Sequence, residues 1–251
     1  MRLPVKHYTI ESPLVPVING EPWSHYEFRY RVKYGTSFGV ITSRDTSCRQ
    51  FLMRTISGPD TDEKIQRVRQ LCHDNIVKGI EIYTFEPESY ILVSEFMPTT
   101  IQHVCRSPKY PNELQLSSIL FQVLQGLQFL LRSELFYEQL TCANLLISLS
   151  GDVKICEVDS CSRSGSFAAV SRSFSKVVMK LMDKEKNSEA VIGLTRPGDW
   201  SSDALSFFSS TTTTSSDFGD LLQHPFLQKR KKEELTWLVH YVLITAHHSR
   251  A

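Results

Sequence analysis

Hydrophobic and polar positions change character after about residue 97. Before that point, short runs alternate between apolar and polar side chains, as in 26–35, "YEFRYRVKYG", which ends at a glycine. Alternation with a period of two residues predicts half-buried strands. Segments 38–45 and 48–56 are therefore expected to form a hairpin. Segments 76–85 and 89–96 are expected to form a second strand pair.

One helix is expected within this strand-rich part. Segment 60–75 places Ile65, Val68 and Leu71 on one helical stripe, and acidic residues stand at its start. Helices dominate after "MPTT", residues 97–100. Segment 116–133 is apolar nearly all round, which is typical of a buried helix. Further helices are predicted at 173–182, 202–208 and 220–227.

The remaining segments are shorter or less regular. Segment 151–158, "GDVKICEV", contains the second of two short strands joined by a Ser-Gly-Asp turn, and the hydroxyl-rich tract 209–217 is expected to be a loop. Residues 1–25 are expected to form an N-terminal arm and residues 228–251 a C-terminal tail. Four apolar residues of the tail share a helical face, which favours packing on the core, with exposure to a partner as the alternative. These residues are Leu235, Leu238, Val239 and Val242.

Composition limits the classes of function. The 251 residues are 41% hydrophobic and 22% charged, which suits one globular domain or two small lobes. The net charge of +1 gives no broad field that attracts nucleic acid or an anionic membrane. The apolar run 238–245 is too short to span a membrane, and the N-terminus lacks the layout of a secretory signal.

Cysteine usage bears on the compartment. The six cysteines form no C-x-x-C pair, which favours reduced thiols over a disulfide or zinc framework. We therefore expect a cytoplasmic protein. The basic run 228–234, "QKRKKEE", keeps a nuclear location as an alternative, although a solvated helix end is the simpler interpretation.

Five segments, taken in order, resemble the eukaryotic protein kinase family. Segment 73–85 is similar to the family's H-P-N-I-V region, 90–97 to the strand and hinge, and 119–148 to the long C-lobe helix and catalytic loop. Segment 151–158 resembles the strand before D-F-G, and 220–227 the final helix of the Ser/Thr branch. The resemblance implies a two-lobed α+β fold, with a β-rich N-lobe at 26–97 and a truncated helical C-lobe at 98–227 that has a shortened activation segment.

The resemblance also assigns the positions that carry phosphoryl transfer. The phosphate-binding lysine falls on Arg54, and its partner glutamate falls on Lys64. Glu63 would point about 100° away on a helix, so Arg54 is expected to lack its usual carboxylate. The catalytic base falls on Gln139, whose amide takes up no proton near neutral pH. The metal-binding asparagine is present as Asn144.

Two further motifs depart from the family pattern. The D-F-G aspartate falls on Glu157, whose extra methylene displaces its oxygens, so Asn144 and Glu157 offer magnesium only a weak site. In "YGTSFGV", residues 34–40, alignment on Gly39 puts Thr36 and Tyr34 at the other glycine positions. An ordinary hairpin turn is therefore favoured over a phosphate cradle. The literal "DFG" at 217–219 follows no strand pair and is interpreted as a helix start, with Asp217 as its N-cap.

Apolar positions of the family core are kept. Ile41, Leu52 and Leu146 are predicted to form the stack that encloses adenine, and Leu52 would narrow that pocket. Tyr137 and Val158 are predicted to fill the other stacked positions. The docking loop and the A-P-E motif of the family are absent from the sequence.

Together these positions favour a pseudokinase: a catalytically inactive module that binds, scaffolds or allosterically regulates a protein partner, for which an active kinase is one candidate. No cofactor, nucleic acid or membrane partner is expected. The alternative is a divergent Ser/Thr protein kinase that uses Arg54, Asn144 and Glu157 for weak transfer from ATP with magnesium. A remnant without a selected role is a third alternative. Gln139 separates the first two hypotheses, because no carboxylate replaces it.

Overall fold

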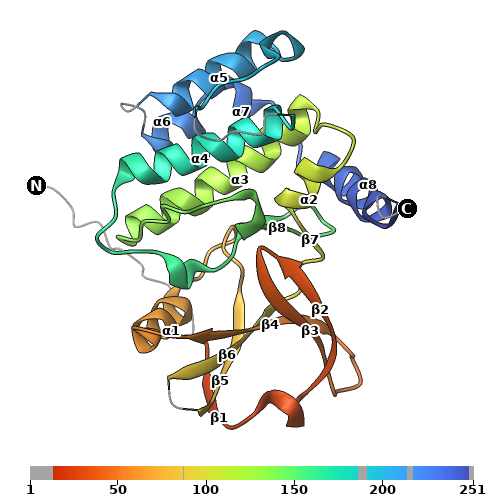
Figure 1. Ribbon diagram of the computed structural model, residues 1–251, viewed down its shortest axis with the longest axis vertical. Helices are drawn as coiled ribbons and strands as arrows, with labels where there is room; N and C mark the ends of the chain where they lie inside the picture. Colours follow the sequence, from red (N-terminus) through yellow and green to blue (C-terminus); the bar gives the residue numbers. More distant parts are fainter. Residues whose placement is uncertain (1–13, 87, 186–190, 214–216, 249–251) are drawn as a thin grey trace, which may run out of the picture.

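The computed structural model describes residues 14–86, 88–185, 191–213 and 217–248 (Figure 1). In that view a β-rich lobe lies below a helical lobe, and the chain passes from one to the other near residue 97. The two-lobed α+β fold predicted from the sequence is confirmed. Strand β6, Ser89–Glu95, ends the sheet of the N-lobe, and β7, Thr99–Thr100, begins the C-lobe.

The N-lobe is built on a six-stranded sheet with the order β1-β5-β6-β4-β3-β2. Its other strands are β1 Val17–Asn19, β2 Tyr26–Tyr34, β3 Thr36–Ser43, β4 Gln50–Ser57 and β5 Gly79–Glu86. Both predicted strand pairs are present as antiparallel neighbours. Helix α1, Thr61–Gln70, packs against the sheet through Ile65 and Val68, as its apolar stripe predicts.

The N-lobe begins earlier than expected. Strand β1 pairs in parallel with β5, and Val15 is buried in the core, so part of the expected arm belongs to the sheet. Pro16 directly precedes β1, and a proline is tolerated at the edge of a sheet. Here Pro16 still accepts a hydrogen bond from the backbone N–H of Ile82 at 3.0 Å. The rest of the expected arm, residues 1–13, lies outside the described residues.

The C-lobe is helical and encloses a small sheet of β7, β8 and β9. Its elements are α2 Ile101–Arg106, α3 Glu113–Arg132, β8 Leu145–Ile147, β9 Val153–Ile155, α4 Phe167–Met182, α5 Ser202–Thr212, α6 Phe218–Leu222, α7 Pro225–Gln228 and α8 Glu234–His248. By length and composition α3 alone, within the described chain, could cross a membrane, but most of it is buried as the central helix of the lobe. An added Cβ at Gly126 would lie 2.9 Å from the carbonyl oxygen of Asn75, so α3 approaches the N-lobe closely there.

Two predictions about the C-terminal third need correction. Helix α5 continues into the hydroxyl-rich tract as far as Thr212, because Ser210 and Thr211 donate to carbonyls one turn back and Thr211 is buried. The predicted helix 220–227 is two short helices, which meet where Pro225 starts α7. The predicted tail face is confirmed, since its four apolar residues, given above, are all buried.

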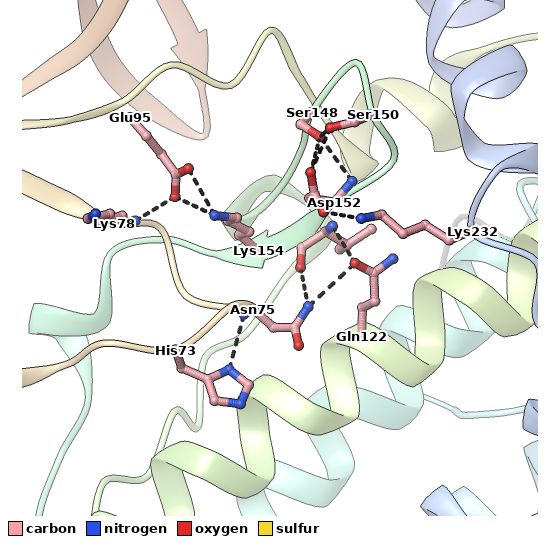
Figure 2. Close-up of polar contacts among 11 residues, drawn as sticks. His73, Asn75, Lys78, Glu95, Gln122, Ser148, Ser150, Asp152, Lys154 and Lys232 are labelled. Carbon is pink, nitrogen blue, oxygen red and sulfur yellow. Dashed lines mark hydrogen bonds and ion pairs between the residues drawn. The ribbon is translucent and has the colours of Figure 1, made fainter. Parts of the chain in front are cut away.

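Polar side chains join the two lobes behind the hinge (Figure 2). The Asn75 amide donates to the carbonyl of Val153 at 3.0 Å and to Oε1 of Gln122 at 3.4 Å. On the hinge side, Glu95 accepts from the Lys78 backbone N–H and from Nζ of Lys154, both at 2.7 Å. These contacts join segment 75–78 and the end of β6, in the N-lobe, to β9 of the C-lobe.

Candidate functional site: a filled cleft between the lobes

A hydrophobic cluster fills the space where the two lobes meet. It consists of Tyr34, Phe38, Val40, Leu52, Met97, Leu146 and Cys156, all of them buried. Strands β2, β3 and β4 of the N-lobe, the connection after β6, and β8 and the residue after β9 in the C-lobe supply its members. We call this set the filled cleft. Its Leu52 and Leu146 are two of the three residues predicted to enclose adenine.

The prediction that Ile41 is the third residue of that stack is wrong. Ile41 packs with Tyr26, Phe51 and Tyr83 on the other face of the sheet, and Val40 takes its place in the filled cleft. Side chains alternate along a strand, so an alignment error of one residue exchanges the two faces. The error came from matching Gly39 to the last glycine of the family motif.

Two aromatic side chains of the hairpin formed by β2 and β3 occupy the cleft. Tyr34 and Phe38 have ring centroids 5.9 Å apart, and the Tyr34 hydroxyl donates to the carbonyl oxygen of Pro98 at 2.7 Å. Burial raises the pKa of Tyr34 well above its ordinary value, so the hydroxyl stays a donor across the physiological range. The hinge carbonyl of Pro98 therefore already accepts a hydrogen bond from a side chain of the protein itself. The sequence analysis did not identify either ring as a cleft residue, although Phe38 is the third residue of β3, close to the turn.

The turn between β2 and β3 lies against the catalytic-loop segment. Gly35 has a φ of +80°, and a Cβ added there would stand 3.0 Å from that of Ala143. The next residue, Thr36, donates its hydroxyl to Oε1 of Glu157. The turn is thus an ordinary hairpin turn, as expected. It packs against Ala143, the neighbour of Asn144.

The predicted metal ligands bind each other. Nδ2 of Asn144 donates to Oε2 of Glu157 at 3.1 Å, while Oδ1 of Asn144 accepts from the backbone and hydroxyl of Thr141. Both carboxylate oxygens of Glu157 are therefore engaged, one by Thr36 and one by Asn144. The structure places the two predicted ligands side by side, but two side chains supply fewer oxygen ligands than calcium takes from a dedicated protein site. No cluster of three metal-ligating side chains occurs among the described residues.

Arg54 has a carboxylate partner that the sequence did not indicate. Its two terminal nitrogens form a bidentate ion pair with Asp159, with one N–O distance of 3.2 Å. Burial works against the charged guanidinium, but the Asp159 carboxylate outweighs it and raises the pKa of Arg54. Arg54 therefore lacks its usual carboxylate from helix α1, as expected, but Asp159, which the sequence analysis did not consider, takes the place of that carboxylate. On α1, Lys64 contacts the carbonyl of Ser57 instead.

Local backbone geometry explains that pair. Glu157 has a φ of +58°, the left-handed region that non-glycine residues adopt only in a few per cent of cases. The chain then makes a single 3₁₀ turn at Val158–Ser160, which places Asp159 against β4. Arg67 of α1 holds the same turn by donating to the carbonyl of Cys161 at 2.6 Å. A conformation of this kind has no clear signal in the sequence.

Gln139, at the position of the family's catalytic base, lies apart from these groups. Gln139 is exposed and lines an open cavity of about 380 Å³ together with Thr141, Lys176 and Lys180. Its neighbour Glu138 accepts from the backbone N–H of Ser166 at 2.7 Å and is committed to the start of α4. Helix α4 begins at Phe167, so the segment after the 3₁₀ turn is only six residues long, at 161–166. The shortened activation segment is thus present as predicted.

Fold and site together define a two-lobed protein of the kinase type, with a hinge, a catalytic-loop segment and a D-F-G-like turn in the expected places. Tyr137 and Val158, which the resemblance assigned to the core, are both buried. In the described residues, a buried apolar cluster fills the space between the lobes.

Comparison with known proteins agrees with this class. The family described as the protein kinase domain matches residues 60–176. Mitogen-activated protein kinase 5 of Oryza sativa subsp. indica is 29% identical over 102 residues, which are 39% of this chain and 27% of that protein. Mitogen-activated protein kinase pmk-2 of Caenorhabditis elegans is 26% identical over 106 residues, with 40% and 25% covered. Cyclin-dependent kinase-like 4 of Mus musculus is 27% identical over 94 residues, with 38% and 28% covered.

The fold and these matches together support a likeness of this chain to the eukaryotic protein kinase family, on its Ser/Thr branch. The matched region spans only about a quarter of the length of these relatives. The relatives are protein kinases by name. Their activity does not transfer to this chain by likeness alone.

Proposed function

We propose that this protein is a catalytically inactive, kinase-like module that acts by binding a protein partner, as a scaffold or an allosteric regulator. The observation that carries the proposal is the filled cleft. Seven buried side chains occupy the place where the family binds adenine, and two of them are aromatic rings from the chain's own hairpin. A nucleotide would have to displace both rings and the hydrogen bond from Tyr34 to Pro98.

The charged groups support the same proposal. Phosphoryl transfer depends on cations and metal ions held ready for the phosphates. Here Arg54 is paired with Asp159, and Asn144 is hydrogen-bonded to Glu157. Arg54, Asn144 and Glu157, to which the resemblance assigns phosphate and metal contacts, are therefore all satisfied within the protein. Disrupting a buried ion pair carries a large desolvation penalty, which a weakly held ligand would not offset.

The missing base supports it further. Gln139 has no proton-accepting side chain, and Glu138 is held at the start of α4. A base must come within hydrogen-bonding reach of the attacking hydroxyl, and no second carboxylate lines the cavity around Gln139 within the described residues. The family fold is retained while its chemistry is not, and a role in binding accounts for that combination.

Phosphotransfer by the full-length chain tests the proposal. The protein is incubated with γ-labelled ATP, magnesium or manganese, and casein or histone as generic acceptors. We expect no incorporation above that of a Gln139→Ala control. Incorporation that is lost in Glu157→Ala or Arg54→Ala would overturn the proposal and favour a divergent protein kinase that uses these residues.

A further inference from the structure

A cationic groove runs along the outer mouth of the filled cleft. It has a volume of about 800 Å³, within the range of ligand sites. One wall is β2, and the other is formed by α2 and by α8, which lie side by side at the same end of the hairpin (Figure 1). Arg31 and Lys33 of β2 and Arg106 of α2 line it, and no aspartate or glutamate of the described residues does so.

The three cations of this groove are available to a ligand. All three side chains belong to exposed residues, and none forms an ion pair within the described parts of the chain. The guanidinium of Arg31 lies over the ring of Phe28, 5.9 Å from the ring centroid. Outside the groove, Arg29, Lys229 and Lys232 have a carboxylate partner. Other exposed basic residues, such as Lys109 and Arg163, form no ion pair among the described residues, but they do not line the groove. The groove therefore concentrates unpaired positive charge in a protein whose net charge is only +1.

The wall formed by β2 is a free sheet edge. Strand β2 is the last strand of the six-stranded sheet, and among the described residues it pairs with β3 alone. Five consecutive residues, Arg31 to Gly35, line the groove, whereas a groove over one face would contact alternate residues. Unpaired backbone groups of an edge strand can take up another strand. The strand also exposes Tyr30, with 51% of its surface accessible, and aromatic residues are enriched at protein interfaces.

The geometry points to an acidic, extended segment of a protein partner as the occupant of this groove. The segment would add to the edge of β2, and its carboxylates would face Arg31, Lys33 and Arg106. Leu243 and Ala246 of α8 provide an apolar side for alternate residues of the segment. Strand addition supplies affinity through backbone hydrogen bonds, and side-chain pockets supply specificity. This inference rests on the proposed binding function and names the chemistry of its partner.

Fluorescence anisotropy with a labelled decapeptide of alternating glutamate and valine tests the inference on the full-length chain. We expect saturable binding that weakens at high salt, because exposed charges are screened. Arg31→Glu with Lys33→Glu should weaken binding at least about tenfold, since like charges then face each other. A matched control, Lys109→Glu with Arg163→Glu, makes the same charge change at exposed positions outside the groove. It should alter binding less than about twofold.

Backbone pairing is tested with a second peptide, in which alternate peptide nitrogens are methylated on one edge or on the other. Methylation on the edge that faces β2 should weaken binding about tenfold, because those N–H donors are lost. If the strand variant does not fold, as judged by its Tm, Arg106→Glu on α2 takes its place. Absent binding at millimolar peptide, equal affinity for the groove and control variants, or insensitivity to methylation on either edge would each overturn the inference.

The two proposals fail separately. If neither peptide binding nor phosphotransfer is detected, the inference about the groove is overturned and the proposal of an inactive module stands. Phosphotransfer activity overturns the inactive module whatever the peptide does.

Discussion

At the scale of single residues, the site differs from that of an active kinase mainly in what its polar side chains bind, and less in which residue types are present. Arg54, Asn144 and Glu157 stand where the family resemblance placed them, but each is bonded to another side chain of this protein. Asp159 was missed because its role depends on a left-handed residue and a 3₁₀ turn. A pattern of residue types does not encode such a turn, and only the fold reveals which carboxylate reaches Arg54.

The pair of Arg54 and Asp159 should contribute strongly to stability. Their side chains are only 12% and 10% exposed, so removing one leaves a buried charge without a partner. We expect Asp159→Ala to lower the free energy of unfolding by about 3–5 kcal/mol. The double variant Arg54→Met with Asp159→Ala should be more stable than the single one, because both charges are gone. Urea denaturation measures both. A single variant as stable as the wild type, or a double variant that is worse, would contradict this role.

At the scale of elements, the hairpin of β2 and β3 fills the cleft, because it contributes Tyr34, Phe38 and Val40. The sequence predicted the strands, the helix stripe of α1 and the buried α3, because their periodicity is strong. The faces of β3 were predicted wrongly, since period-two patterns give no absolute register and the glycine motif is degenerate. Consequently Phe38 and Val40 were not recognised as cleft residues, and Ile41 was. Contacts across the molecule, not local propensity, determine which face is inward.

The aromatic rings of the hairpin should be tightly coupled to stability. Phe38→Ala is expected to cost about 3–5 kcal/mol of unfolding free energy, because it leaves a cavity in the filled cleft. Tyr34→Phe should cost about 1 kcal/mol through loss of the hydrogen bond to Pro98. The control Tyr30→Phe lies on the same strand with half of its surface exposed and should be near neutral. Equal losses for the three variants in urea denaturation would argue against a packed cleft.

The turn after β8 is joined to the start of the C-terminal helix by an ion pair of Asp152 and Lys232 (Figure 2). Burial alone would raise the pKa of Asp152, but hydrogen bonds from Lys232, Ser150 and Ser148 lower it from 3.8 to about 2. The folded pKa is below the unfolded one, so this stabilisation is present above pH 4 and is lost as the pH falls toward 2.

The stability difference between wild type and Asp152→Asn should therefore shrink between pH 4 and 2. Its size at pH 7 should stay below about 1 kcal/mol, because the pair is partly exposed and screened by solvent. Urea denaturation at several pH values gives the profile, and high salt should reduce it. A difference that grows as the pH falls would show that the carboxylate is not stabilised in the folded state.

At the scale of the whole molecule, the chain keeps a kinase fold whose two lobes are joined through their interior. In this structure the filled cleft, the closed hairpin turn and the network behind the hinge all bridge the lobes. Such a molecule is expected to present a fixed outer surface, not a cleft that opens and closes around a nucleotide. Its groove beside β2 would then be a preformed site, which limits the entropy lost when a partner binds.

A thermal-shift titration with ATP, with and without magnesium, tests the central claim most directly. A ligand at about 100 times its Kd stabilises the native state by roughly 2.7 kcal/mol. For a chain of this size that corresponds to a rise in Tm of roughly 5 °C or more. With the cleft filled, millimolar ATP and magnesium should leave Tm within about 1 °C of the value without ligand. A rise of several degrees that disappears in Asn144→Ala or Glu157→Ala would contradict the account, because nucleotide and metal would then occupy the cleft.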